Sequence, residues 1–175
     1  WVLTLAQVTR DDDDVTGFAG TLTDITGEHN AEERLIALVE HSSDAIVVIG
    51  PDATIQFSSA TMTRMFGWEN DELIGRMGLD LLHPDDLDRA ISTLTDLVRR
   101  GPGTKETLSY RVHHKSGSWI PVEVVGVNLL DDPAVEGIVL NVRDITERVE
   151  ADRLLAESRE RYRQIVETSD EGIWT

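Results

Sequence analysis

The sequence contains one strand-joint-helix pattern twice, and this repeat limits the fold more than any other feature. Near the C-terminal end, an apolar strand pattern at 138–142 runs into Asp-Ile-Thr at 144–146, and a charged helical pattern follows at once. Near the start, a strand pattern at 17–22 runs into Asp-Ile-Thr at 24–26, and helical spacing follows at 31–40. Self-similarity of this kind is typical of tandem repeats, so we expect one complete unit and parts of two others.

We call the Asp-Ile-Thr sequence between strand and helix, at 24–26 and at 144–146, the joint. Its two copies set the expected domain boundaries. Residues 1–27 are interpreted as the C-terminal hairpin of a preceding domain, cut short at its start, and 28–40 as a linker helix. Residues 41–146 form the complete domain, and 147–168 form a second linker helix with coiled-coil character. Residues 169–175 resemble the residues that open the complete domain, so we interpret them as the start of a following domain, also cut short.

Composition narrows the function classes. The 175 residues include 16 Lys and Arg against 33 Asp and Glu, for a net charge of −17, and so acidic a chain lacks the basic face that nucleic acid requires. The absence of cysteine removes disulfides, thiolate metal sites and cysteine nucleophiles, and it fits a reducing cytosol. No apolar run approaches the length of about 20 residues that a membrane span needs. We therefore expect a cytoplasmic fragment with no membrane segment and no nucleic-acid partner.

Within 41–146, the hydrophobic pattern predicts an α+β domain. The expected order is two strands, several small helices, one long helix and three strands, at 45–49, 55–58, 58–76, 84–100, 105–115, 119–130 and 137–144. Because sequential strands joined by short turns pair antiparallel, we expect a five-stranded antiparallel sheet. The long helix has an apolar stripe that must cover one sheet face, made of Leu87, Ala90, Ile91, Leu94 and Val98.

The motifs along this domain resemble those of a PAS domain of the kind found in bacterial and archaeal tandem sensor proteins. Each motif is short, but five of them occur in the order that the family has. They are Asp44-Ala45-Ile46, Phe66-Gly67-Trp68 with Glu72 to Arg76, His83-Pro84-Asp85-Asp86, Lys115-Ser116-Gly117 and Asp144-Ile145-Thr146. The resemblance implies a PAS fold, with small helices and one long helix on one face of the antiparallel sheet and linker helices on either side.

The resemblance also implies a cavity between the sheet and the long helix that can hold a ligand. Helical spacing and strand alternation place seven side chains in it: Met62, Met65, Phe66, Ile91, Leu94, Tyr110 and His114. A surface ion pair between Glu72 and Lys115 is a further implication, and such a pair contributes little when it is exposed.

PAS domains bind haem, flavin, small metabolites or no ligand, and the residue types limit this choice. Blue-light members attach flavin to a cysteine, which this chain lacks, so cysteinyl-flavin is excluded. Haem-sensing members ligate iron through a histidine on the long helix, and 87–100 contains none, which disfavours haem. His113 and His114 are adjacent on a predicted strand and point to opposite faces, so they cannot chelate one metal together. The ligand stays open, and no metal site is assigned.

The resemblance assigns signal output to the joint and to its first copy. The relay residues are Asp144, Ile145, Thr146, Asp24 and Thr26. The spacing of Asp144 and Glu147 fits a capping box, which would end the strand and start the helix at one place.

The helix after the joint has a short coiled-coil seam. Apolar residues recur at alternating spacings of four and three, with Ser158 weakening the seam; the seam residues are Ala151, Leu155, Ser158, Tyr162 and Ile165. We expect a homodimer through the linker helices, with a monomeric linker helix as the alternative.

No catalytic motif occurs in the sequence, so we expect no enzyme within these residues. We interpret the fragment as a sensory module of a multi-PAS signal-transduction protein, next to other PAS domains and a downstream effector such as a histidine kinase. The alternatives are a ligand-free structural or dimerisation spacer, and a regulator of a cyclic-di-nucleotide enzyme or phosphatase. A cavity with convergent polar groups would favour the sensor, and a filled apolar core the spacer.

Overall fold

The chain divides into two compact units, Trp1–His41 and Ser42–Thr175. The computed structural model describes residues 2–11, 14–24, 26–27, 34, 37–39 and 42–170. In the first unit, β1 (Val2–Asp11) and β2 (Asp14–Asp24) form the predicted antiparallel hairpin. Most of the linker helix predicted at 28–40 lies outside the described residues. The described residues in this range, 34 and 37–39, are helical.

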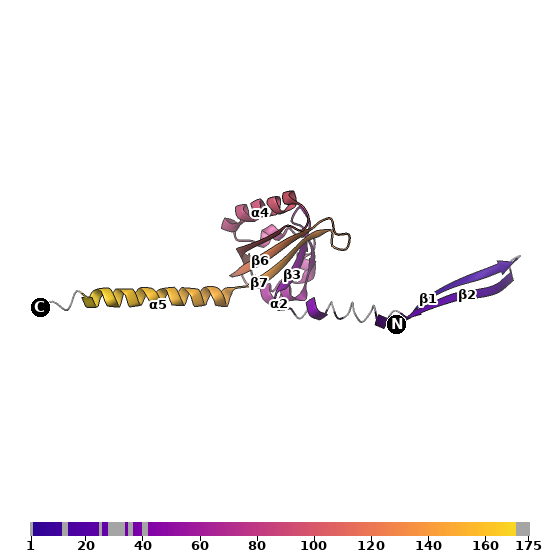
Figure 1. Cartoon of the computed structure of the whole chain (residues 1–175), viewed down its shortest axis with the longest axis horizontal. Coiled ribbons are helices and arrows are strands. Elements are labelled where there is room, and N and C mark those ends of the chain that lie inside the picture. The colour runs from indigo at the N-terminus through magenta and orange to yellow at the C-terminus, as the bar shows by residue number, and fades with distance from the viewer. Residues whose placement is uncertain are drawn as a thin grey trace. The chain divides into compact units, whose positions relative to one another are not determined.

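The second unit is built on a five-stranded sheet in which all neighbouring strands are antiparallel (Figure 1). Its strands are β3 (Ala45–Ile49), β4 (Ile55–Ser58), β5 (Lys105–His113), β6 (Trp119–Leu129) and β7 (Gly137–Asp144). The spatial order is β4-β3-β7-β6-β5. The first and last strands therefore lie side by side, with Ala45 opposite Val142. The predicted α+β class and antiparallel sheet are confirmed.

Small helices and one longer helix connect β4 to β5. They are α2 (Ala60–Phe66), α3 (Asn70–Leu73), two short 3₁₀ helices (Gly78–Leu81 and Pro84–Asp86) and α4 (Leu87–Arg100). The long helix was expected to open at Pro84, but Pro84–Asp86 form a 3₁₀ turn and α4 begins at Leu87. Helix α4 covers one face of the sheet (Figure 1), and the core lies between them.

The buried stripe of α4 differs from the predicted one. Ile91 is 48% exposed, whereas Leu97, which the predicted stripe lacks, is 3% exposed. A helix turns through about 100° per residue, so a stripe centred on Ala90, Leu94 and Leu97 leaves Ile91 at its edge. The hydrophobic pattern therefore predicted the position of the helix correctly, but its buried face is rotated slightly from the predicted one.

Helix α5 (Thr146–Asp170) follows β7 with only Ile145 between them. Residues 151–164 of this helix are exposed on all sides. Within the described residues, no helix is both long enough and apolar enough to cross a membrane. The backbone thus passes from the sheet into a long solvent-exposed helix with almost no connecting loop.

Candidate functional site

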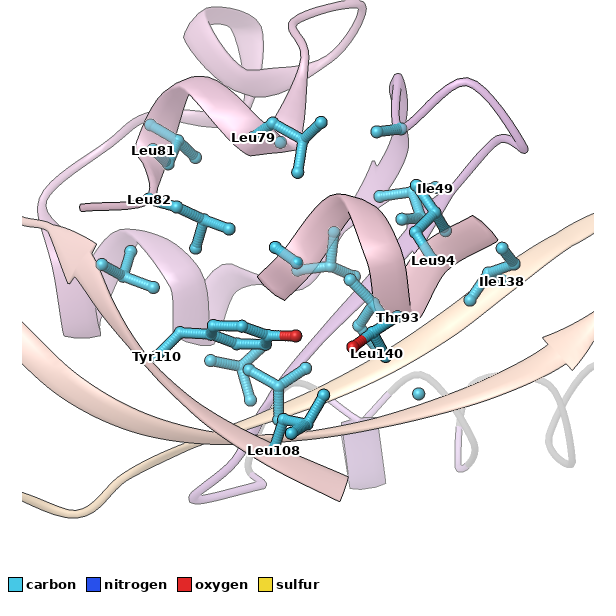
Figure 2. A pocket seen from close by; sticks show the side chains of 18 of the residues that line it. Ile49, Leu79, Leu81, Leu82, Thr93, Leu94, Leu108, Tyr110, Ile138 and Leu140 are labelled. Atoms are coloured by element: carbon cyan, nitrogen blue, oxygen red, sulfur yellow. The ribbon is translucent and has the colours of Figure 1, made fainter. Parts of the chain in front are cut away.

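A cavity of about 140 Å³ lies between α4 and the sheet (Figure 2). All five strands contribute to its wall, together with α2, α4 and residues 78–82. The wall is mainly hydrocarbon. Its polar side chains are Thr93, Glu106 and Tyr110.

The structure brings four of the seven predicted cavity residues together. Met62, Phe66, Leu94 and Tyr110 line the cavity, and Met65, Ile91 and His114 do not. Instead, Ile91 lines a surface groove beside α4, whose wall includes Leu94.

Local geometry explains the positions of the other two residues. Met62 and Phe66 are four residues apart in α2 and share a face, while Met65 is rotated away from it and packs at the edge of the core. Strand β5 ends at His113, so strand alternation does not extend to His114. The His114 Nδ1 lies 2.7 Å from the Ser116 Oγ and accepts the Ser116 N–H at 3.0 Å, within the following turn.

One end of the cavity is polar. The Tyr110 side chain comes from β5, and its hydroxyl points toward Thr93 on α4 (Figure 2). Burial raises the pKa of Tyr110 above its ordinary value. The phenol is therefore neutral near pH 7. The Arg89 guanidinium stacks over the Tyr110 ring, 5.0 Å from its centroid.

Helix α4 is anchored to the sheet at both ends. At its start, the Asp86 carboxylate is 8% exposed and accepts from the Arg111 backbone and Nε, each at 3.0 Å. These hydrogen bonds hold the pKa of Asp86 below its ordinary value. Near its end, the buried Asn128 of β6 donates to the Leu97 carbonyl at 2.9 Å. The roof of the cavity is thus fixed to β5 and β6.

The joint between β7 and α5 is held by one side-chain hydrogen bond, one backbone hydrogen bond and one buried side chain. The Asp144 Oδ1 accepts from the Thr146 N–H at 2.7 Å, and the Ile145 N–H donates to the Pro121 carbonyl at 3.0 Å. The Ile145 side chain is 7% exposed. The Asp144 bond differs from the predicted capping box, which needs the Glu147 N–H. Because α5 begins only at Thr146, the side chain closes an Asx turn instead.

The first copy of the joint has the same turn. The Asp24 Oδ1 accepts from the Thr26 N–H at 2.9 Å, and hydrogen bonds from Thr26 lower the pKa of Asp24. Ile25 lies outside the described residues. The repeat seen in the sequence therefore corresponds to a repeated local structure.

The entry to the domain is tied to its exit. Asp44 immediately precedes β3, and its carboxylate makes a bidentate pair with Arg143 of β7, at 3.0 Å to Nε and 2.7 Å to Nη2. Arg148, in the first turn of α5, lies 3.4 Å from Glu123 of β6. The start of β3, the end of β7 and the start of α5 thus form one connected cluster.

Glu72 and Lys115 form an ion pair on the surface, with 2.6 Å between Oε2 and Nζ. The hydrogen bond from Lys115 is the main cause of a lowered pKa for Glu72. Lys115 also lies over the Trp68 ring, 5.7 Å from its centroid. The pair joins the start of α3 to the turn between β5 and β6, away from the cavity.

Comparison with known proteins decides the family. A family model described as the PAS fold matches residues 33–145. The chain belongs to the PAS fold family. The PAS domain predicted from the five sequence motifs is therefore confirmed, and the cavity described above lies inside it.

Similar proteins come from different organisms. The chain is 28% identical to the White collar 2 protein of Neurospora crassa over 106 residues, covering 61% of this chain and 19% of that protein. It therefore spans about a fifth of the length of that relative. The PAS domain of an HTR-like protein from Haloarcula marismortui superposes with a TM-score of 0.60 at 23% identity, covering 69% of this chain and 96% of that one.

A second solved structure has the same fold. A domain of the sensory box sensor histidine kinase/response regulator from Geobacter sulfurreducens superposes with a TM-score of 0.53 at 21% identity. The match covers 69% of this chain and 97% of that one. At these identities the two solved structures show the fold alone.

The cavity of this PAS domain does not fit the large cofactors known in the family. Its wall offers neither a histidine for haem iron nor a cysteine for a flavin adduct. A volume of about 140 Å³ is also below the roughly 300–1,000 Å³ typical of sites for larger ligands. In the part of the chain that the structure describes, no three His, Asp or Glu side chains cluster as a metal site would require.

Sequence reasoning missed several wall residues of the PAS domain. Val124 and Gly126 of β6 and Leu140 and Val142 of β7 line the cavity, and all lie on the face that strand alternation assigns to the core. The alternation could have identified them. A Cβ at Gly126 would lie 3.3 Å from Leu140 Cδ2, so a larger residue there would require Leu140 to shift slightly.

Proposed function

We propose that this PAS domain is a sensory and regulatory module that passes ligand or partner binding through Asp144, Ile145 and Thr146 to a downstream output. The supporting observation is the continuity between the cavity wall and the joint. In β7, the cavity-lining Val142 is two residues before Asp144. In β6, the cavity-lining Val124 is three residues after Pro121. The Pro121 carbonyl accepts the hydrogen bond from the Ile145 N–H. A change inside the cavity therefore acts on the strand ends that hold the start of α5.

The similar proteins support a signalling role. One solved structure is a domain of a sensor histidine kinase/response regulator, and we infer a histidine kinase as the output of the parent protein. A cyclic-di-nucleotide enzyme or a phosphatase is the alternative output. The hairpin at 1–27 and the residues at 169–175 would then belong to neighbouring PAS domains, with no catalytic step inside the fragment itself.

A ligand-free spacer is the second candidate, and the small, mainly hydrocarbon cavity favours it. The hydroxyl pair of Tyr110 and Thr93 favours the sensor, because a purely structural core gains little from polar groups facing a cavity. Binding measurements on the cavity separate the two candidates.

The relay proposal predicts a local effect at Asp144. Replacing Asp144 with alanine should cost about 1 kcal/mol of stability and should speed hydrogen exchange at the amides of Thr146, Glu147 and Arg148, because the start of α5 loses its closing turn. Exchange measured by NMR checks this. Asp24→Ala removes the same turn from the first unit and serves as the matched control, with no change expected in α5. Unchanged exchange in α5 of the Asp144→Ala protein would count against the relay.

We also propose that the parent protein dimerises through α5. In the described chain, the seam residues Ala151, Leu155, Ser158 and Tyr162 are all exposed, Leu155 at 50% and Tyr162 at 71%. A long helix with little tertiary contact is marginal in water, and a second copy would bury its apolar side chains. The pairing would give the relay two alternative helix arrangements.

The dimer proposal predicts a gain from repairing the seam. Ser158→Leu should tighten the dimer by at least tenfold, because a buried leucine contributes about 1.5 kcal/mol or more. Ala156→Leu is the control, since it adds the same side chain on the opposite side of α5. Sedimentation equilibrium compares the two variants. Equal dissociation constants for both variants would place the interface elsewhere.

A further inference from the structure

This inference rests on the proposed sensory function and concerns its ligand. We propose that the cavity takes a neutral, mainly apolar molecule about the size of one aromatic ring, with one hydroxyl or N–H group that donates to the Tyr110 hydroxyl. Volume, wall chemistry and hydrogen-bond direction each support one part of this description.

The volume sets the size of the ligand. A protein cavity of about 150 Å³ lined by Leu, Ile and Phe admits benzene. The cavity here has about 140 Å³ and a wall of the same residue types, including Phe66, Leu97 and Ile138. A single-ring molecule therefore fits without repacking, and a fused tricyclic ring system does not.

The wall chemistry sets the charge. No Lys, Arg or His side chain lines the cavity. The charged side chain in the wall is Glu106, which is paired with Arg100. An anion would lose its hydration without gaining a cationic partner, and burying an unpaired charge is strongly unfavourable. The site therefore selects against carboxylates and phosphates.

The hydroxyl pair sets the direction of the hydrogen bond. The Thr93 hydroxyl donates its one proton to the Arg89 carbonyl at 2.9 Å. Thr93 therefore has no proton left to donate to the Tyr110 oxygen. Tyr110 lines the cavity, so its hydroxyl oxygen can accept a hydrogen bond from a group inside it. The ligand then supplies the donor.

Phenol, toluene and benzoate test these statements, because they share one ring and differ in one group. Each is titrated at pH 7 into the full chain and followed by NMR. Phenol should bind about tenfold more tightly than toluene, the effect of one net hydrogen bond. Benzoate should bind at least a hundredfold more weakly than phenol, because its carboxylate has no partner in the wall.

Two variants locate the binding. Tyr110→Phe should lower the affinity for phenol to that for toluene and leave toluene unchanged. Val124→Phe should weaken both by more than tenfold, because the added ring occupies the cavity. Val125→Phe is the matched control: Val125 neighbours Val124 in β6, pairs with the exposed Asn141 and does not line the cavity, so both affinities should stay the same.

Equal affinities for benzoate and phenol would overturn the assignment of a neutral ligand. Phenol binding that neither Tyr110→Phe nor Val124→Phe weakens would overturn the assignment to this cavity. Absence of binding by both phenol and toluene would overturn the ligand class alone, because the exchange test at Asp144 uses no ligand and decides the relay separately.

Discussion

Replacing Asp86 with alanine is expected to lower the free energy of unfolding by about 3 kcal/mol. The carboxylate is 8% exposed and is the acceptor for the Arg111 guanidinium and backbone. Breaking a fully buried pair by removing one partner costs about 3–5 kcal/mol. Here only Asp86 is buried and the Arg111 side chain is 40% exposed, so the lower end of that range is expected. Urea denaturation measures the loss.

Asp85→Ala is the matched control for Asp86→Ala. Asp85 precedes Asp86, has a side chain 72% exposed and lies 3.4 Å from the same Arg111. Its removal should cost less than about 1 kcal/mol, since exposed pairs contribute little. Similar losses for the two variants would show that Asp86 does not anchor α4 in the way described.

The Asp86 contribution should depend on pH with a definite sign. Its pKa is lower in the folded state than the value of about 3.9 expected in the unfolded chain. The stabilisation is therefore complete above the unfolded value and is lost as the pH falls from about 4 through the folded pKa. The difference in the free energy of unfolding between the wild-type protein and Asp86→Ala should therefore become smaller as the pH falls through that range.

Replacing Phe66 with alanine is expected to cost about 3–5 kcal/mol, the largest effect predicted here. Phe66 is 0% exposed and lines the cavity, so its removal loses hydrophobic burial and enlarges a space that the neighbouring side chains cannot fill. Thermal and urea denaturation should agree on this loss.

Phe57→Ala is the control, since it deletes the same side chain at a position that is 46% exposed on β4. That change should cost less than half as much, because a half-exposed ring has less burial to lose. Equal losses at the two positions would mean that the core is not centred between α4 and the sheet.

The fold could be predicted from sequence because local signals agreed with one another. Alternation in β5, short turns between β5, β6 and β7, and the apolar stripe of α4 all led to one antiparallel sheet covered by a helix. The spatial order of the strands was not predicted, because periodicity does not say which distant strands pair. The position of β3 beside β7 comes from the structure.

The candidate site was harder to predict because it depends on small rotations of helix α4 and on the exact residues at which β5 ends and α5 begins. A small rotation of α4 relative to the prediction exposes Ile91 and buries Leu97. His114 lies one residue beyond the end of β5. The Asp144 turn depends on α5 starting at Thr146, a boundary that spacing does not fix. Contacts between distant residues, such as Asp86 with Arg111 and Asn128 with Leu97, carry no local signal at all.

A double-mutant cycle on hydrogen exchange in α5 tests most directly whether the cavity is coupled to the emerging helix. Val124→Phe fills the cavity permanently, and Val125→Phe again serves as control. The relay predicts that Val124→Phe changes amide exchange at 147–150 in the wild-type background, and that this change disappears when Asp144 is replaced with alanine. The relay would be contradicted if Val124→Phe left amide exchange in α5 unchanged. It would also be contradicted if Val124→Phe changed that exchange equally in the wild-type and Asp144→Ala backgrounds.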